Sequence, residues 1–479
     1  MFTLELGRRG NARYFGRTKV LIPSIRLAAG AAVCCIHVSG ACSSEVPWSI
    51  PSAEIDSYVR AYSDTNNFSG VVLVAREGHE VFARAYGHTD ARRRTPNTLR
   101  TRFHIASMSM QFTAAATLRL VDSGRLSLDT PVSAILPDYP GGDRINIRHL
   151  LTQTSGIADI NELPDYSQIL QAHQTPTSLV ERMRAVPPAR DPGEFVREEH
   201  SAYNLLALII ERRTGTPFAA AVKQLVFAPL GMRDSGIDDD GPQTQHRAAV
   251  GLSPERVFDV RPAERIHWSA KAGNASAYST AADELKWLNG LFGGNFLSPA
   301  LRSQMFDLTA RVGYGWFKSN STRFGAPIYW MSGRAPGFAS AMNYFPQQRI
   351  FVVLLSNVYA SFPSRMGDDI AAMVLGLPYD KSPLQNVRSV SADASIAGDF
   401  RYSADFYQPN AMIQLRLEGM DYSLRWPSGD TTYLIPTGKD RFIDRSYGVT
   451  VEAVRDGSGR MIGLKYDRFL GDLASSAGG

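Results

Sequence analysis

Ser107 is the residue that the sequence best places for covalent chemistry. It begins an apolar, alanine-rich stretch that predicts a helix over 107–121, and the backbone N–H groups of a helix N-terminus can stabilise a developing oxyanion. A serine hydroxyl needs a neighbouring base to become a good nucleophile. One turn later on the same face stands Met110, whose thioether carries no charge and accepts no proton near neutral pH. The alternative is that Ser107 is only the helix N-cap, a position that serine favours.

The elements around Ser107 are predicted from hydrophobic periodicity and from Gly or Thr residues at segment ends. The predicted helices are 107–121, 204–211 and 280–288, and the predicted strands are 68–75, 80–87, 339–345 and 350–355. A helical middle with strands before and after it fits one mixed sheet packed against helices, an α/β architecture.

The character of the chain changes near residue 383, where helical segments give way to short strands and turns. Asp456–Gly459 has the composition of a hairpin turn, so we predict a small all-β barrel. The predicted order is a leader at 1–45, a first domain at 46–383, a linker at 384–395, the barrel at 396–470 and a tail at 471–479.

The basic charge of the chain is confined to its leader. The first 42 residues hold six of the 51 basic residues and one of the 46 acidic residues, so the remainder carries 45 of each sign. A body without net charge gives no reason to expect nucleic acid or an anionic membrane surface as a partner.

All three cysteines, Cys34, Cys35 and Cys42, also lie in the leader. Its basic start and apolar stretch resemble an export signal, and residues 39–42 loosely resemble a lipoprotein cleavage box, with Cys42 as the lipidated residue. We therefore expect an exported, periplasmic or membrane-anchored lipoprotein that meets the membrane only through lipid; a disordered tail or an upstream mis-assigned start is the alternative. With no Cys in the body and no short His/Cys cluster, no metal or cofactor is expected.

Several short segments carry a family resemblance through their order and spacing. They are Leu126–Asp129, Ile147–Gly156, Asp191–Phe195, Pro229–Met232, Tyr278–Thr280, Pro336–Phe338 and Leu355–Asn357. Together they resemble the penicillin-binding-protein-like serine hydrolases, the family of class C β-lactamases, DD-carboxypeptidases and related esterases, over residues 68–358. The resemblance implies an antiparallel sheet flanked by helices, and the C-terminal part is similar to the lipocalin-like barrel of many members.

The resemblance also locates the catalytic motifs, which are degenerate here. The family pattern Ser-x-x-Lys falls on Ser107 with Met110 in the lysine position. The pattern Tyr-x-Asn falls on Glu198, Glu199 and His200, so an acid replaces the proton-transferring tyrosine and an imidazole replaces the asparagine.

The third family pattern, Lys-Thr-Gly or His-Thr-Gly on the innermost strand, falls on Met331, Ser332 and Gly333. The strand cation has therefore become a methionine. The next residue, Arg334, would complete the oxyanion hole through its backbone N–H, and its guanidinium could bind a ligand carboxylate or lie on the surface. Met110 and Met331, with Met108, could line the cleft for an apolar ligand or simply fill voids.

The joint loss of these groups predicts a pseudoenzyme that binds a small molecule, a peptide- or ester-like ligand, or a protein, and does not hydrolyse it. The alternative is a repurposed enzyme. It would be an esterase or acyltransferase with a Ser107–His200–Glu198 triad, or a non-covalent lyase, isomerase or cyclase that uses Glu198 or His200. A solvated loop with local ion pairing is the remaining interpretation of the segment around Glu199. Hydrolysis of β-lactams is not expected.

Overall fold

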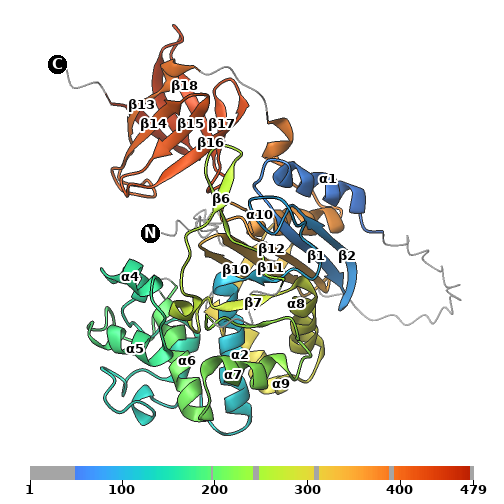
Figure 1. The fold of residues 1–479 in the computed structure, drawn as a ribbon, viewed down its shortest axis with the longest axis vertical. Helices are drawn as coiled ribbons and strands as arrows, with labels where there is room; N and C mark the ends of the chain where they lie inside the picture. The colour runs from blue at the N-terminus through green and yellow to red at the C-terminus, as the bar shows by residue number, and fades with distance from the viewer. Residues whose placement is uncertain (1–48, 196–197, 241–246, 307–311, 388–392, 475–479) are drawn as a thin grey trace, which may run out of the picture. The chain divides into compact units, whose positions relative to one another are not determined.

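The computed structural model describes residues 49–195, 198–240, 247–306, 312–387 and 393–474 (Figure 1). The predicted leader, and Cys42 with it, lies outside these residues. The chain separates into units at Met1–Ser49 and Ile50–Gly479, and every described helix and strand belongs to the second unit. Among the described residues we find no helix that combines the length and apolar character needed to span a lipid bilayer.

A seven-stranded sheet forms the centre of the first domain, in the order β2-β1-β12-β11-β10-β9-β8. Its strands are β1 Gly70–Arg76, β2 His79–Tyr86, β8 Val312–Gly313, β9 Trp316–Ser321, β10 Ala326–Ala335, β11 Phe338–Phe345 and β12 Ile350–Ser356. The strand pairs are antiparallel, so the expectation of a mixed sheet is wrong. Short turns join β1 to β2 and β10 through β12, and such turns can connect only antiparallel neighbours.

Both faces of the sheet are buried because successive side chains of a strand point in opposite directions. In β1, Val71 and Leu73 join a core with residues of α2 and α6, whereas Val72 and Val74 join a second core with residues of α1 and α10. Figure 1 shows α1 and α10 on one side of the sheet and α2 and α8 on the other. The predicted antiparallel sheet flanked by helices is confirmed.

The helices lie mainly in the middle of the chain, as predicted. They are α1 Ser52–Ser63, α2 Met110–Asp122, α3 Ile147–Leu151, α4 Tyr166–Leu170, α5 Pro176–Arg184, α6 His200–Thr214, α7 Phe218–Val222, α8 Ala281–Leu288, α9 Pro299–Phe306 and α10 Pro363–Val374. Thr280 caps α8 by accepting a hydrogen bond from the Asp283 amide at 3.3 Å. Gly215 ends α6 at a φ of 71°, a conformation that glycine adopts without strain.

A small sheet, in the order β3-β7-β4, lies beside the start of α2. Its strands are β3 Phe103–His104, β4 Gly236–Ile237 and β7 Ala277–Ser279. A further hairpin pairs β5 Leu252–Pro254 with β6 Val260–Pro262. Because β3 leads directly into the Ser107 segment, this small sheet fixes the direction from which the chain approaches the candidate nucleophile.

The C-terminal part is a closed eight-stranded barrel, which confirms the predicted all-β barrel. Its strands are β13 Gly398–Arg401, β14 Met412–Glu418, β15 Asp421–Arg425, β16 Thr431–Gly438, β17 Arg441–Asp444, β18 Thr450–Arg455, β19 Met461–Tyr466 and β20 Phe469–Leu473. Pairing of Phe400 with Leu473 closes the barrel. Closure leaves no open sheet edge for another chain to pair with.

One buried arginine of the barrel, Arg445, contacts the first domain. Its guanidinium donates to the carbonyl oxygens of Asp259 at 2.7 Å and of Asn66 at 3.1 Å, and also to the carbonyl of Arg256. The side chain is fully buried. Burial lowers the pKa of this guanidinium to about 10, so the charge is retained near neutral pH and each of these hydrogen bonds is charge-assisted.

Candidate functional site

The segment that carries Ser107 is held in a strained backbone conformation. Ser107 lies in the short helix η1 (Ala106–Ser109), which precedes α2. Ala106 has a φ of 51°, a left-handed value that residues with a Cβ rarely adopt and that persists only where the surroundings enforce it. The enforcing contacts are on Ile105, whose amide donates to the Ala277 carbonyl at 3.0 Å and whose carbonyl accepts from Ser340 Oγ at 2.6 Å.

Gly333 on β10 lies directly against this segment. A Cβ on Gly333 would stand 2.3 Å from the Ile105 carbonyl oxygen and 2.7 Å from the Ser107 nitrogen. Only a residue without a side chain allows β10 to approach so closely. The structure therefore brings Ser107 and the Met331–Arg334 segment together, as the family resemblance implied.

Ser107 is not a helix cap, so that expectation is wrong. The N-cap of η1 is Ile105 and that of α2 is Ser109, and neither side chain makes a capping hydrogen bond. The structural serine of the segment is Ser109, which donates to the Ala106 carbonyl at 2.6 Å and accepts from the Ala277 amide at 2.9 Å. Among the described residues, the partly exposed Ser107 hydroxyl has no hydrogen-bond partner.

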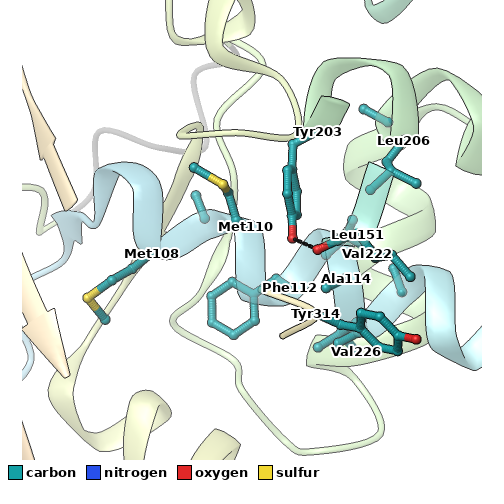
Figure 2. Close-up of a cluster of buried hydrophobic side chains, with 14 of the residues drawn as sticks. Met108, Met110, Phe112, Ala114, Leu151, Tyr203, Leu206, Val222, Val226 and Tyr314 are labelled. Carbon is teal, nitrogen blue, oxygen red and sulfur yellow. Dashed lines mark hydrogen bonds between the residues drawn. The ribbon is translucent and has the colours of Figure 1, made fainter. Parts of the chain in front are cut away.

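Met110 occupies the place of the missing base and is fully buried. Figure 2 shows its thioether above Phe112 and beside Tyr203, whose hydroxyl donates to the Leu151 carbonyl at 3.0 Å. Its sulfur accepts a weak hydrogen bond from Gln153 Nε2 at 3.9 Å. A buried thioether with an amide neighbour cannot remove a proton from a serine hydroxyl.

Met108 and Met331, like Met110, have no solvent-exposed surface and belong to the main hydrophobic core. Of the two sequence interpretations, the geometry agrees with void filling, because a fully buried side chain offers no surface to a ligand. Ser332 lies next along β10 and is partly buried.

Arg334 points away from Ser107, because its side chain lies on the face of β10 opposite to that of Gly333. Its guanidinium donates to the carbonyl oxygens of Ser446 in the barrel and Ser361, both at 2.9 Å, and lies 5.2 Å from the ring centre of Tyr359. Burial lowers the pKa of Arg334. The side chain therefore contributes to domain packing, and only its backbone is placed to serve the site.

Glu199 is buried and fully engaged, contrary to the expectation of a solvated loop. Its carboxylate accepts hydrogen bonds from Ser155 Oγ at 2.7 Å, the Ser155 amide at 2.9 Å and the Gly156 amide at 3.0 Å. Arg190 donates to it at 3.1 Å, and the Glu199 amide donates to Gln153 Oε1 at 3.0 Å. Glu199 therefore fixes the loop before α6, and it has little capacity left to bind a ligand.

His200 begins α6 and has a carboxylate partner that the sequence did not indicate. Its Nδ1 lies 3.0 Å from Asp159 Oδ2, and its Nε2 lies 3.9 Å from Glu198 Oε2. Burial lowers the pKa of His200, but the hydrogen bond to Asp159 and the charges of Asp159 and Glu198 outweigh it, so the pKa is raised. Burial raises the pKa of Asp159, but His200 outweighs this effect and the pKa is lowered.

No hydrogen bond joins Ser107 to His200 in the part of the chain that the structure describes. In the hypothetical Ser107–His200–Glu198 triad, the imidazole is therefore oriented by Asp159 and makes no hydrogen bond to the serine. The triad remains a prediction.

Lys271 is a further ionisable group near His200 that sequence reasoning missed. It ends η6 (Trp268–Lys271), lies 4.9 Å from the ring centre of Tyr166, and donates to the Tyr166 hydroxyl. Burial lowers the pKa of Lys271 to about 8, although the charge of Asp159 opposes the shift. Clusters of groups with shifted pKa values are typical of functional sites, so the titratable groups of the candidate site are His200, Asp159 and Lys271, not Met110.

Aromatic side chains pack against β3, the strand that leads into Ser107. His104 of β3 stacks on Trp268 with ring centres 3.7 Å apart and planes 7° apart, and its Nε2 lies 2.9 Å from Asp238 Oδ2. Phe338 meets the same imidazole edge-on at 5.1 Å. These contacts hold the Trp268 segment against the strand that leads into Ser107.

The family profile described as Beta-lactamase matches residues 55–376. The chain belongs to this family. Among curated proteins, penicillin-binding protein 4* of Bacillus subtilis is 26% identical over 423 residues, which cover 81% of this chain and 90% of that protein. Esterase EstB of Burkholderia gladioli is 29% identical over 320 residues, covering 55% of this chain and 78% of the esterase.

Among solved structures, the octameric penicillin-binding protein homologue from Pyrococcus abyssi has a TM-score of 0.61 at 21% identity, covering 88% of this chain and all of that one. At this level of identity the likeness supports the fold of this β-lactamase-family protein and says nothing of its activity.

Proposed function

We propose that this β-lactamase-family protein binds a peptide- or ester-like ligand beside Ser107 and does not hydrolyse it. The observation that carries the proposal is the environment of the serine. Met110 fills the position of the family base as a fully buried, uncharged side chain, and the Ser107 hydroxyl has no hydrogen-bond partner among the described residues.

The energetic consequence is large. General acid–base assistance contributes roughly 10²- to 10⁴-fold to a rate, which corresponds to about 3–5 kcal/mol of activation free energy. A serine without that assistance retains only the help of nearby backbone N–H groups. Those donors bind an acyl oxygen whether or not the serine attacks it, so they support binding without turnover.

The groups that remain fit a ligand with an acyl or carboxylate oxygen. The start of η1 and the Arg334 amide supply backbone donors on one side of Ser107. Lys271, with a pKa of about 8, brings a positive charge near neutral pH, and the carboxylate partner of His200 raises the pKa of its imidazole. A protein partner that presents such a group is a second form of the same proposal.

A repurposed enzyme is the second candidate, favoured by the His200–Asp159 pair. An imidazole held at 3.0 Å by a carboxylate is the arrangement that general bases use, and esterases occur among the relatives. For this candidate to hold, His200 has to move to within hydrogen-bond distance of Ser107, or act with Glu198 without a covalent step.

The test is intact-mass labelling of the purified full chain with a fluorophosphonate and, separately, with benzylpenicillin. Ser107→Ala is the control. We expect no Ser107-dependent adduct, together with saturable binding of an N-acyl-D-alanyl-D-alanine peptide in calorimetry. A mass gain that disappears in Ser107→Ala would overturn the binding-only proposal and support acyl transfer. Absence of both adduct and peptide binding in folded protein would contradict the proposed ligand class.

A gain-of-function control uses three substitutions, Met110→Lys, Glu198→Tyr and Met331→His, which together we name the triple revertant. It restores the lysine, the tyrosine and the strand cation, one group in each motif, and leaves His200 in the asparagine position. Labelling of the triple revertant by the fluorophosphonate would demonstrate that the probe reaches the serine, so that a negative result with the natural chain reports lost chemistry and not lost access.

The cellular location rests on the leader alone. We propose export, with lipid attached at Cys42 and no other contact with the membrane. Mass spectrometry of the N-terminal peptide from the native host tests this, since an unmodified Cys42 in the mature chain would refute lipidation.

A further inference from the structure

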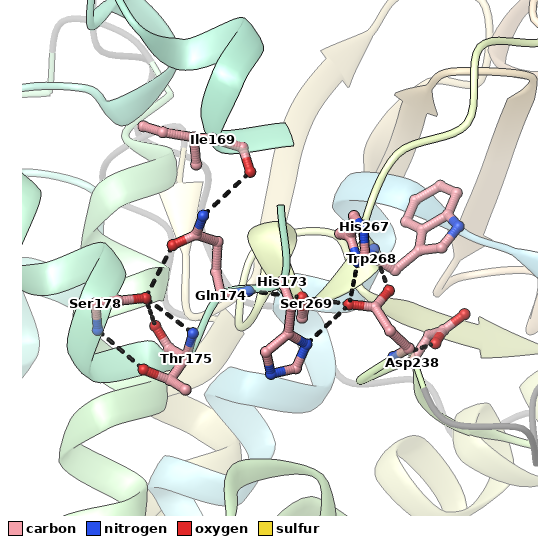
Figure 3. A network of polar contacts seen from close by, with 10 residues as sticks. Ile169, His173, Gln174, Thr175, Ser178, Asp238, His267, Trp268 and Ser269 are labelled. Atoms are coloured by element: carbon pink, nitrogen blue, oxygen red, sulfur yellow. Dashed lines mark hydrogen bonds and ion pairs between the residues drawn. The ribbon is translucent and has the colours of Figure 1, made fainter. Parts of the chain in front are cut away.

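His173, Asp240 and His267 meet at one point although they come from three separate segments. His173 lies between α4 and α5, Asp240 follows β4, and His267 immediately precedes η6. Figure 3 shows the two histidines and Ser269 converging on one carboxylate beside Trp268. None of these residues belongs to the Ser107 motifs.

The three side chains present one ligand atom each, and these atoms all lie within 4.8 Å of one another. Both histidines approach the same atom: His173 Nδ1 and His267 Nδ1 are each 3.2 Å from Asp240 Oδ2. The histidine side chains are 57% and 43% exposed, and the carboxylate is 19% exposed. The cluster is therefore reachable from solvent, with the acid at its inner end.

With neutral imidazoles, hydrogen bonding leaves this arrangement crowded. Ser269 Oγ also donates to Asp240 Oδ2, so three donors converge on an oxygen that has two lone pairs. Both Nδ1 atoms would also have to carry the single proton of a neutral imidazole. The two contacts of 3.2 Å lie at the long end of the N–H···O range, whose mode is about 2.9–3.0 Å.

We propose that His173, Asp240 and His267 bind a divalent transition-metal ion, with zinc the best fit. Zinc takes nitrogen at about 2.0–2.1 Å and carboxylate oxygen at about 2.0–2.2 Å in tetrahedral sites, which places neighbouring ligand atoms roughly 3.3–3.5 Å apart. The two separations from Asp240 Oδ2, 3.2 Å each, are within about 0.3 Å of that edge length, and the three ligand atoms all lie within 4.8 Å of one another. A metal at this point uses one lone pair of Oδ2 and leaves the second for Ser269.

The groups behind the ligands are already in place. The second carboxylate oxygen of Asp240 accepts from the Trp268 amide at 2.8 Å, and the Asp240 amide donates to Asp238 Oδ1 at 2.8 Å. Ser269 Oγ also accepts from the Gln174 amide at 3.0 Å. Such outer contacts orient metal ligands and tune their affinity.

Three protein ligands leave a fourth position, which faces solvent here because both imidazoles are partly exposed. The ion would fasten the loop between α4 and α5 to the segment that carries Trp268 and Lys271. The proposal thus adds a zinc site that supports the Trp268–Lys271 segment, independently of whether Ser107 is reactive.

The test is titration of chelator-treated full chain with Zn²⁺ in calorimetry, and with Co²⁺ followed by visible absorption, which reports tetrahedral coordination. The variants are His173→Ala and His267→Ala. The matched control is His79→Ala, an exposed histidine at the start of β2. We expect one ion per chain, a loss of affinity of at least about 100-fold in either cluster variant, and no change in the control.

A further variant, Ser269→Ala, removes an outer contact and should weaken zinc binding by about 10- to 100-fold. Thermal melts without metal verify that each variant is folded. Absence of zinc binding by the natural chain, or binding that survives both His173→Ala and His267→Ala, would overturn the proposal and leave a hydrogen-bonded cluster only.

Discussion

Substitution of Gly333 by alanine tests whether the close approach of β10 places Ser107. The new Cβ would stand 2.3 Å from the Ile105 carbonyl oxygen, whereas ordinary contacts begin near 3.4 Å, so the backbone must move by roughly 1 Å. Overpacking of this kind costs about 1–3 kcal/mol. The shift also breaks the 2.6 Å hydrogen bond from Ser340 to Ile105, which is worth about 1 kcal/mol. We expect a loss of about 2–4 kcal/mol in the free energy of unfolding.

The assay is urea unfolding followed by intrinsic fluorescence, with the slope m compared between variants. The matched control is Gly457→Ala in the barrel, where a Cβ would meet nothing within 4 Å and the change should stay within about 0.5 kcal/mol. A Gly333→Ala protein as stable as the control would refute the reasoning, because β10 and the Ser107 segment would then have room to spare.

Four further outcomes are expected. Asp159→Asn should lower the pKa of His200, measured by NMR titration of its ring resonances, because the hydrogen bond and the negative charge that raise it are removed; an unchanged pKa would contradict the assigned pair. In the natural chain, the stability that this pair adds should be largest between about pH 4 and 6.5. It should fade as the pH falls through the lowered pKa of Asp159 or rises through the raised pKa of His200. Glu199→Gln should cost about 2–4 kcal/mol in urea unfolding, since a buried charged acceptor with four partners is lost, whereas exposed Glu194→Gln should be neutral; equal effects would argue against the anchoring role. The triple revertant should react with the fluorophosphonate while Met110→Lys alone does not, and labelling of that single variant would indicate that one cation suffices.

Much of the fold could be predicted because local pattern and tertiary structure agree in it. Local sequence patterns predict several elements directly: the β-branched run of β1, the alternation of β2 and the Thr280 cap of α8. The family segments predict the order of the elements along the chain. The motif register also placed Gly333 correctly beside Ser107. The cap assignment failed because Ala106 takes a left-handed conformation and starts the helix one residue earlier, a strain imposed by β7 and β11 that local propensity does not encode.

The site could be predicted only where its residues are neighbours in sequence. Asp159 is 41 residues from His200, and Asp240 is 67 residues from His173 and 27 from His267, so no spacing rule connects them. The burial of Glu199 is equally hidden. A carboxylate is buried only when it is paired, and the partners of Glu199 include backbone N–H groups more than 40 residues away, which have no residue-specific signature.

The contacts of Arg445 limit how readily the barrel can be exchanged between related proteins. Among the described residues, the carbonyl oxygens of Asn66 and Arg256 accept from this one barrel side chain, whereas that of Asp259 accepts from it and from the Glu255 amide. A barrel exchanged by recombination for another of the same topology would remove this shared donor unless it carried an arginine at the same position. The barrel is therefore separate in architecture and yet not a freely interchangeable module. Substitution of Arg445 would remove this constraint, and the two domains could then accumulate substitutions independently of each other.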